Sequence, residues 1–306
     1  MASSIDANAE SNRGWSNWPT MDLPSLFVSH GSPMIALEPG AAGAFLQRLG
    51  PAIDAAFGRP RAVLAVSAHT TARAPVLLAA ARHDTVHDFG GFPPALYALR
   101  YDAPGAPAFA ADVAARLAAA GIAAPRIDEG GLDHGIWTVL RFIYPQADIP
   151  VLPLALVPDM APSKLFALGA VLGALRGEGV LVLGTGSITH NLRLAFSARP
   201  PRADQRHTAD TTTSDEIPES RAFRTWFAER SAVRDWDALF DYRRHAPHAA
   251  LMHPTDEHLL PWYVAAGAGG RSAAPLRLYE GVSLSSLGMD SYAFGETAAT
   301  LQEALR

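Results

Sequence analysis

Three short runs of almost wholly apolar residues constrain the fold of this chain more than any other feature. They are SLFVS at 25–29, AVLAV at 62–66 and GVLVL at 179–183, and each leads into a polar turn. Short runs that are apolar at every position are typical of strands buried on both faces of a sheet. Helix-like segments separate the three runs. We therefore expect a single-domain α/β fold, with a central mixed or parallel sheet flanked by helices.

Other segments extend this alternation along the chain. The periodicity predicts further strands at 75–80 and 151–157, and helices at 41–57, 107–120, 164–175, 219–230 and 257–266. The segments 83–104 and 199–218 show neither strand nor helix periodicity. They are predicted to be long loops, which are often functional. Since no repeat and no second composition appears, we expect one catalytic domain over 23–306. The polar residues 1–22 are predicted to be a flexible leader.

Composition excludes several classes of site and partner. The formal net charge is −5 and no basic stripe is present, which argues against a nucleic-acid partner and against an anionic membrane surface. The chain has no cysteine, so a transition metal must be held by nitrogen and oxygen ligands. No apolar run reaches the length of a membrane span and the first residues do not resemble a signal peptide, so the cytoplasm is the default location.

Histidines stand where the predicted strands end. His30 and His69 follow the first two apolar runs, and His190 lies shortly after the third. Because the carboxyl ends of parallel strands meet at one edge of a sheet, these three side chains are candidates for one site, with His134 and His258 as further candidates. Neutral imidazole is the commonest metal ligand. Taken singly, each histidine is more typical of a surface or capping residue, so only the joint pattern favours a metal site.

Other motifs are weaker. Gly184-Thr185-Gly186 lacks the third glycine of a dinucleotide fingerprint and no Walker lysine follows it, so phosphate binding there is disfavoured. No G-x-S-x-G elbow is present, which argues against a serine hydrolase. Surface placement is predicted for His207, His245 and His248, and the place of His253 stays open.

Six motifs in a fixed order carry a family resemblance. They are Ser29-His30-Gly31-Ser32-Pro33, Ser67-Ala68-His69, His87-Asp88-Phe89-Gly90-Gly91-Phe92-Pro93, Leu132-Asp133-His134-Gly135, Thr189-His190-Asn191-Leu192 and Pro254-Thr255-Asp256-Glu257-His258. With these motifs, the chain resembles the 4,5-DOPA extradiol dioxygenase family, within the class III extradiol ring-cleaving dioxygenases. The resemblance runs from about Leu23 to Phe294.

The resemblance implies one divalent non-haem metal ion at the carboxyl edge of the sheet, with His30 and His69 as ligands. In the wider superfamily the third ligand is a glutamate four residues before a tryptophan. Here His258 stands four residues before Trp262, which looks like a replacement of carboxylate by imidazole. Fe(II) is the metal expected for activity, and an all-histidine set also suits Zn(II), so Zn(II) is a second candidate for the isolated protein.

His134 and His190 match two histidines of the superfamily that handle protons. The base is assigned first to His190 and second to His134, and His190 is also a candidate fourth metal ligand. Thr70 stands where relatives often carry an aromatic residue, which implies a wider or reshaped pocket. The implied partners are O₂ and a small aromatic diol, either DOPA-like or another small catechol. We expect a monomer or a small homo-oligomer.

Three alternatives stay open at this stage. A zinc-dependent hydrolase would use the same histidines to activate water. The fold also resembles Memo-like proteins, whose pocket serves for binding without catalysis. A structural protein with incidental histidines is the third alternative. The aromatic segment 87–93 is predicted to be either a wall of the substrate pocket or a rigid loop packed by its own rings.

Overall fold

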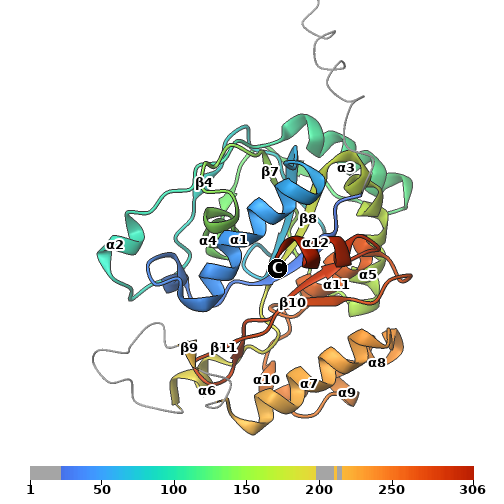
Figure 1. Cartoon of the computed structure of the whole chain (residues 1–306). Coiled ribbons are helices and arrows are strands. Elements are labelled where there is room, and N and C mark those ends of the chain that lie inside the picture. Colours follow the sequence, from blue (N-terminus) through green and yellow to red (C-terminus); the bar gives the residue numbers. More distant parts are fainter. Residues whose placement is uncertain (1–21, 198–209, 212–215) are drawn as a thin grey trace, which may run out of the picture.

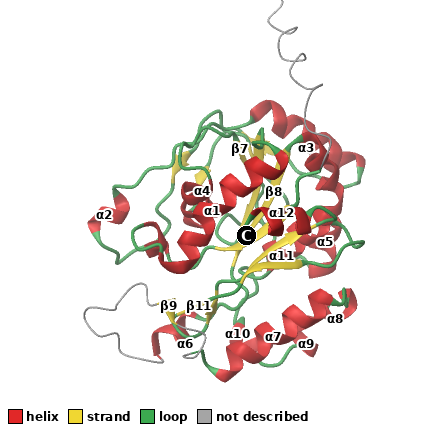
Figure 2. Ribbon diagram, viewed as in Figure 1, coloured by secondary structure: helices red, strands yellow, loops and turns green. Residues whose placement is uncertain are grey.

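The computed structural model describes residues 22–197, 210–211 and 216–306. A six-stranded mixed sheet with the strand order β10-β13-β1-β8-β2-β7 forms its centre (Figures 1 and 2). The predicted single-domain α/β fold is thus confirmed. Residues 1–21 of the predicted leader, and most of the loop predicted at 199–218, lie outside the described residues.

The sheet combines a parallel part with an antiparallel edge. Its strands are β1 (Ser25–Ser29), β2 (Ala62–Ser67), β7 (Val151–Pro153), β8 (Val180–Gly186), β10 (Leu276–Tyr279) and β13 (Ser291–Phe294). The strands β1, β8, β2 and β7 run parallel, whereas β13 is antiparallel to β1 and β10 is antiparallel to β13. Three minor sheets are formed by β3 (Leu77–Leu78) with β5 (Arg126–Ile127), by β4 (Asp84–Thr85) with β6 (Gly131–Leu132), and by β9 (Asp210–Thr211), β11 (Val282–Ser283) and β12 (Leu287–Gly288).

Alternate residues of each central strand enter two separate cores. On β2, Leu64 and Val66 face one core, whereas Val63 and Ala65 face the other. Side chains of a strand alternate between the two faces of a sheet, so a strand covered on both faces must be apolar throughout. This explains why the central strands have no polar face in the sequence.

Helices pack on both faces of the sheet and contribute apolar side chains to both cores (Figure 2). One core is covered by α1 (Gly40–Phe57), α4 (His134–Ile143) and α12 (Ala298–Ala304), with α2 (Pro94–Tyr97) and the 3-10 helix η1 (Pro33–Ala36) at its margin. The other core is covered by α3 (Pro107–Ala119), α5 (Pro162–Leu172), the 3-10 helix η2 (Gly173–Glu178) and α11 (Leu260–Gly269). A group in the lower part of Figure 1 extends that second core: α7 (Pro218–Ala232), α8 (Trp236–Phe240), α9 (Tyr242–His245) and α10 (Ala249–Met252). The short α6 (Leu192–Ser197) follows β8.

Several predicted boundaries were wrong. The helix predicted at 257–266 begins only at Leu260, with Pro261 in its first turn, so His258 lies in the turn before it. The strand predicted at 151–157 ends at Pro153, which has no N–H to donate, and continues only as isolated bridges. The strand predicted at 75–80 shrinks to Leu77–Leu78. The sequence interpretation also missed α4 and the antiparallel strands β10 and β13.

No helix in the described ranges is long and apolar enough to cross a membrane.

Candidate metal centre and active site

Histidines from remote segments converge at the carboxyl edge of the sheet. His30 follows β1 and His69 lies two residues after β2, while His258 reaches the same place from the turn before α11. The ring centroids are 5.0 Å apart for His30 and His69, 5.4 Å for His30 and His258, and 4.9 Å for His69 and His258. One potential ligand atom from each of the three lies within 4.8 Å of the others. The structure therefore brings together the three residues predicted as ligands.

The hydrogen bonds of His30 fix which ring nitrogen faces the centre. The Thr185 hydroxyl donates its single hydrogen to the Gly135 carbonyl at 2.8 Å, so it accepts from His30 Nδ1 at 2.9 Å. Nε2 of His30 is then unprotonated, and it lies 3.1 Å from Nε2 of His69. A metal-binding histidine is commonly oriented in this way by a partner of its other nitrogen.

The other two rings are backed by carboxylates. Nδ1 of His258 donates to Glu257 Oε1 at 3.1 Å, and Nδ1 of His69 lies 3.5 Å from Asp88 Oδ2. The hydrogen bond to Glu257 leaves Nε2 of His258 as the free ligand atom, whereas the His69–Asp88 distance is an ion-pair distance and fixes no tautomer of His69. Nε2 of His30 and Nε2 of His69 face each other at 3.1 Å. Nitrogens on one ion, bonded at about 2.1 Å and 90–110° apart, are separated by about 3.0–3.4 Å, so the His30–His69 pair fits a divalent metal.

Burial keeps these imidazoles neutral. Desolvation, followed by repulsion between the rings, lowers the pKa of His30 well below its usual value. The same causes lower the pKa of His69 to about 3. Burial also lowers the pKa of His258, although Glu257 opposes that shift. Because only a neutral imidazole binds a metal, the three rings are in the state that a ligand requires at neutral pH.

A glycine of β8 lets His258 approach the sheet. A Cβ atom on Gly186 would lie 2.0 Å from the His258 carbonyl oxygen, a distance that real Cβ atoms do not adopt. The same carbonyl accepts a 2.8 Å hydrogen bond from the backbone N–H of Ser187. Gly184 allows a similar approach of Pro261. Glycine is therefore needed at 184 and 186 because the segment from His258 to Pro261 packs directly against β8.

His134 is held at the start of α4 by two aspartates. Asp88 accepts from the His134 backbone N–H at 2.9 Å and from its Nδ1–H at 3.0 Å, so the lone pair of the neutral ring is on Nε2. Burial works against ionisation of Asp88, but the His134 hydrogen bonds outweigh it and lower the pKa of Asp88 to about 2. Asp133 caps α4 and accepts hydroxyl hydrogens from Ser67 and Thr70. Thr70 donates its hydroxyl hydrogen to Asp133 and is not among the residues that line the cavity, so the wider or reshaped pocket inferred from this position stays a prediction.

His190 lies beside this cluster in a different arrangement. Its ring stacks on His258 with centroids 3.4 Å apart and planes 7° from parallel. Its potential ligand atom groups with those of Glu257 and His258, in a set that is separate from His30 and His69. Desolvation, with repulsion from His258, lowers the pKa of His190 to about 2.

A cavity of about 600 Å³, here called the histidine cavity, opens over these rings. His30, His69, His134, His190 and His258 all line it. Its remaining walls are largely apolar and include Phe89, Phe92, Leu192, Phe196, Leu284 and Leu287. The rings of Phe89 and Phe92 also pack edge to face at 5.3 Å, so the segment 87–93 is both a wall of the cavity and a loop packed by its own rings.

Other histidines lie away from the cluster. His253 is fully buried and donates from Nε2 to the Ile188 carbonyl at 2.8 Å, which makes it a core residue. His83 is buried too, and Nε2 donates to the Val151 carbonyl at 2.9 Å. His245 and His248 are exposed, as predicted, whereas His207 lies outside the described residues.

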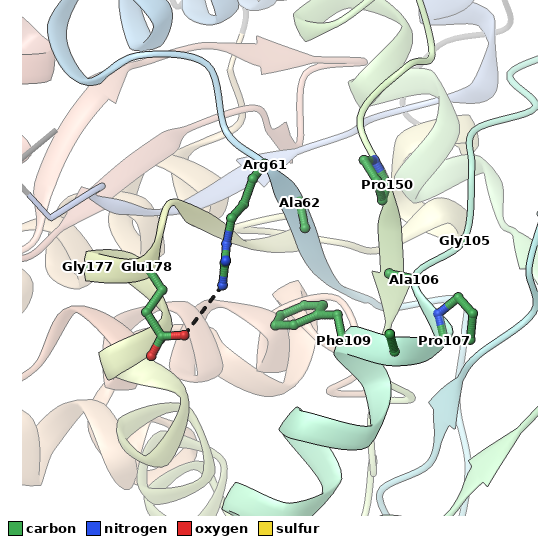
Figure 3. A pocket seen from close by; sticks show the side chains of 10 residues that line it. Arg61, Ala62, Gly105, Ala106, Pro107, Phe109, Pro150, Gly177 and Glu178 are labelled. Atoms are coloured by element: carbon green, nitrogen blue, oxygen red, sulfur yellow. Dashed lines mark hydrogen bonds and ion pairs between the residues drawn. The ribbon is translucent and has the colours of Figure 1, made fainter. Parts of the chain in front are cut away.

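A second cavity, of about 710 Å³, lies at the opposite, amino edge of the same sheet (Figure 3). This amino-edge cavity is lined by residues around the starts of β2 and β7, among them Ala62, Phe109 and Pro150. Its charged lining residues are Arg61 and Glu178, which pair with each other at 3.4 Å. Its lining contains no histidine in the described part of the chain. It is the larger hollow, but it lacks the groups that metal chemistry requires.

Comparison with known proteins agrees with the site. A family model for the catalytic LigB subunit of aromatic ring-opening dioxygenase matches residues 24–295. The chain belongs to this family. It is 34% identical to the 4,5-DOPA dioxygenase extradiol of Escherichia coli (strain K12), over 89% of this chain and 95% of that protein. It is 32% identical to the protein of the same name from Beta vulgaris, over 89% of this chain and 97% of that protein.

The LigB fold is shared with a solved structure. A crystal structure of an uncharacterized protein from Escherichia coli K12 superposes with a TM-score of 0.70 and 29% sequence identity, covering 89% of this chain and 100% of the other. The family resemblance in the sequence is thereby confirmed. The chain is a ring-opening dioxygenase, an oxidoreductase of a metal-dependent family, with a histidine cluster that can hold the ion.

The sequence interpretation missed the residues behind the histidines. Thr185 and Asp88 were not assigned any role, although they orient His30 and His134. Thr185 lies in a glycine motif that was tested only for phosphate binding. Asp88 lies in a predicted loop, and its position beside His87 in an aromatic motif was the one available signal.

Proposed function

We propose that this LigB-family enzyme is a non-haem extradiol dioxygenase that opens the ring of a catechol with O₂, using one Fe(II) ion bound by His30, His69 and His258. The observation that carries this proposal is the convergence of ring nitrogens from His30, His69 and His258, with Nε2 of His30 and Nε2 of His69 at 3.1 Å from each other. Residues 23–306 act as one catalytic domain in this proposal. The curated relatives named for 4,5-DOPA cleavage support a catechol as the substrate.

A bound divalent metal supplies acidity to a catechol hydroxyl and a common site for both reactants. The chain supplies orientation and proton transfer. His134 lines the cavity and carries the lone pair of its neutral ring on Nε2, so it is placed to take a proton from a catechol hydroxyl. Asp88 behind the ring stabilises the imidazolium that this proton transfer creates.

His134 therefore precedes His190 as the base in our proposal, which reverses the order inferred from the sequence. His190 stacks face to face on His258, and the nearby Glu257 carboxylate is hydrogen-bonded to His258 and not to His190. Its proposed role is to contact the substrate from the wall of the cavity, with metal ligation as the alternative. The apolar rings of Phe89 and Phe92 line the cavity, and Phe89 packs edge to face on His134 with ring centroids 5.6 Å apart.

The reaction breaks the ring bond beside the two hydroxyl-bearing carbons, and both atoms of O₂ enter the product. The test is anaerobic reconstitution with Fe(II), followed by addition of O₂ and a small panel of catechols. We expect one O₂ to be consumed for each catechol, with formation of a yellow ring-opened product. A protein that turns over ester or amide substrates without O₂, and consumes none with catechols, would instead be the zinc-dependent hydrolase. Tight catechol binding without turnover would favour a Memo-like binding protein.

A further inference from the structure

The turn that joins β11 to β12 has an unusual backbone for its sequence. Its central residues, Leu284 and Ser285, have φ values of 50° and 60°. The backbone N–H of Ser286 donates to the Ser283 carbonyl at 3.3 Å and closes the turn. Positive φ at both central positions is the pattern of a type I′ turn, in which glycine, asparagine and aspartate dominate because larger side chains strain this conformation. A leucine at such a position is uncommon and is a candidate for a functional role.

The side chain of this leucine belongs to the wall of the histidine cavity. Leu284 lines the cavity, whereas Ser285 beside it is not among the described lining residues. Leu287, from the other strand of the hairpin, lines the cavity too and is buried. Of the two residues with strained backbone, the bulky apolar one is therefore the one at the cavity.

Hydrogen bonds hold this hairpin against the segment that leads from β8 to His190. The Thr189 hydroxyl donates to the Ser286 carbonyl at 2.7 Å and accepts from the Gly288 N–H at 2.7 Å. The backbone N–H of Ile217, the residue before α7, donates to a carbonyl of the turn at 3.0 Å. The hairpin is thus a braced wall on the His190 side of the cavity, and a braced wall discriminates between ligands by their size.

The proposed base lies in another part of the cluster. The ring centroid of His134 is 4.0 Å from that of His69, whereas the ring of His190 stacks on His258 with centroids 3.4 Å apart. In the proposed function one catechol hydroxyl faces His134 while both hydroxyls face the metal. The ring substituent then extends away from the base, toward the wall that the hairpin forms.

Resting on the proposed function, we propose that Leu284 is a specificity-determining residue. Its side chain packs against the substituent of the catechol and limits the bulk of the atoms nearest the ring. The limit acts through shape, so it holds for charged and uncharged catechols alike and is compatible with a DOPA-like side chain, whose first atom beyond the ring is a methylene group.

Catechols that differ only in the bulk of an uncharged substituent test the inference. They are 4-methylcatechol and 4-tert-butylcatechol, which present the same pair of hydroxyls to the metal. Leu284→Ala should raise kcat/KM for the tert-butyl compound relative to the methyl compound by about tenfold, because it makes room beside the ring. Leu284→Phe should lower the same ratio. Anaerobic calorimetry with Zn(II)-loaded protein should show the relative affinities moving in the same directions without turnover.

Two control variants isolate the side chain of Leu284. Ser285→Gly changes the neighbouring residue of the same turn, which has the same sign of φ. Leu278→Ala truncates another half-buried leucine, on β10, which is not among the described residues that line the cavity. Both controls should keep the wild-type ratio of the two substrates. Metal analysis of the Leu284 variants should give the wild-type content, because Leu284 offers no ligand atom.

The outcomes separate this inference from the proposed function. An unchanged substrate ratio in Leu284→Ala and Leu284→Phe, at full metal content, would overturn the role of Leu284 and leave the dioxygenase intact. An equal change in Ser285→Gly or Leu278→Ala would overturn the assignment to this side chain. Failure of the wild-type enzyme to cleave any catechol would overturn the proposed function and this inference with it.

Discussion

The two cavities at opposite edges of the central sheet differ in chemistry more than in size. The amino-edge cavity is the larger, at about 710 Å³ against about 600 Å³, and its charged residues neutralise each other. The histidine cavity holds ring nitrogens from remote segments that face one another, with carboxylates behind two of the rings. The comparison teaches that volume does not identify a metalloenzyme site. The convergence of several buried imidazoles on one point does identify such a site.

The largest loss of metal and activity should follow when a proposed ligand in the histidine cavity is removed. His69→Ala takes away one of the two facing nitrogens, so the metal should be lost and activity should fall below about 0.1% of wild type. Metal analysis and O₂ uptake measure the two effects. Full metal content in this variant would show that His69 is not a ligand.

Removing the proposed base should separate chemistry from metal binding. His134→Ala should retain the metal and lower kcat by about 10²–10⁴-fold. Steady-state O₂ uptake with metal analysis of the same sample checks both parts. Loss of metal in this variant would contradict the role assigned to His134.

A smaller loss should follow when the residue behind that base is changed. Asp88→Asn keeps the shape of the side chain but removes the charge that faces the His134 ring, so activity should fall about 10–100-fold. Asp84→Asn offers a control, because Asp84 is exposed on β4 and lies outside the cavity lining. Equal rates for Asp88→Asn and wild type would remove Asp88 from the mechanism.

Packing at the carboxyl edge and at the amino edge of the sheet can be compared by substituting one glycine at each. Gly186→Ala forces the His258 backbone away from β8, and overpacking of this kind costs about 1–3 kcal/mol of unfolding free energy. Metal affinity should fall with it. Gly177→Ala at the amino-edge cavity meets only the Asp22 side chain, at 2.8 Å, which can move aside. Thermal unfolding and metal titration measure the two effects. Equal stability and equal metal affinity of the Gly186→Ala and Gly177→Ala variants would contradict the packing argument.

The smallest effect is expected at the ion pair of the amino-edge cavity. Glu178→Gln weakens contacts with Arg61 and Arg116 that are partly exposed, so the unfolding free energy should fall by about 1 kcal/mol or less. The rate of catechol cleavage should not change. A clear change in kcat would show that this edge of the sheet communicates with the histidine cavity.

Prediction from sequence succeeded where one physical rule dominated. The apolar runs at β1, β2 and β8 could only be buried strands, and their order along the chain placed His30 and His69 at one edge. Strand prediction failed where the residues are partly exposed on both faces of the strand. All four residues of β10 are partly exposed, so no alternation marked the strand.

The contacts that orient the site could not be predicted for a different reason. Thr185 orients His30 from a distance of 155 positions along the chain, and Asp88 bonds to His134 across 46 positions. Such pairs follow from the tertiary fold and leave no local periodicity. The turn that carries His258 was predicted to be helical because Pro261 and the apolar residues after it do form a helix, and its start was misplaced by three residues.

The position of Thr185 has a consequence for how the enzyme acquires its ion. The ring of His30 on β1 is oriented by a hydroxyl of β8, and that hydroxyl in turn is engaged by the first turn of α4. A partly folded chain in which any one of these elements is undocked lacks the oriented nitrogen. If His30 is a ligand as proposed, metal binding requires β1, β8 and α4 to be docked together, and the bound ion stabilises that docked arrangement.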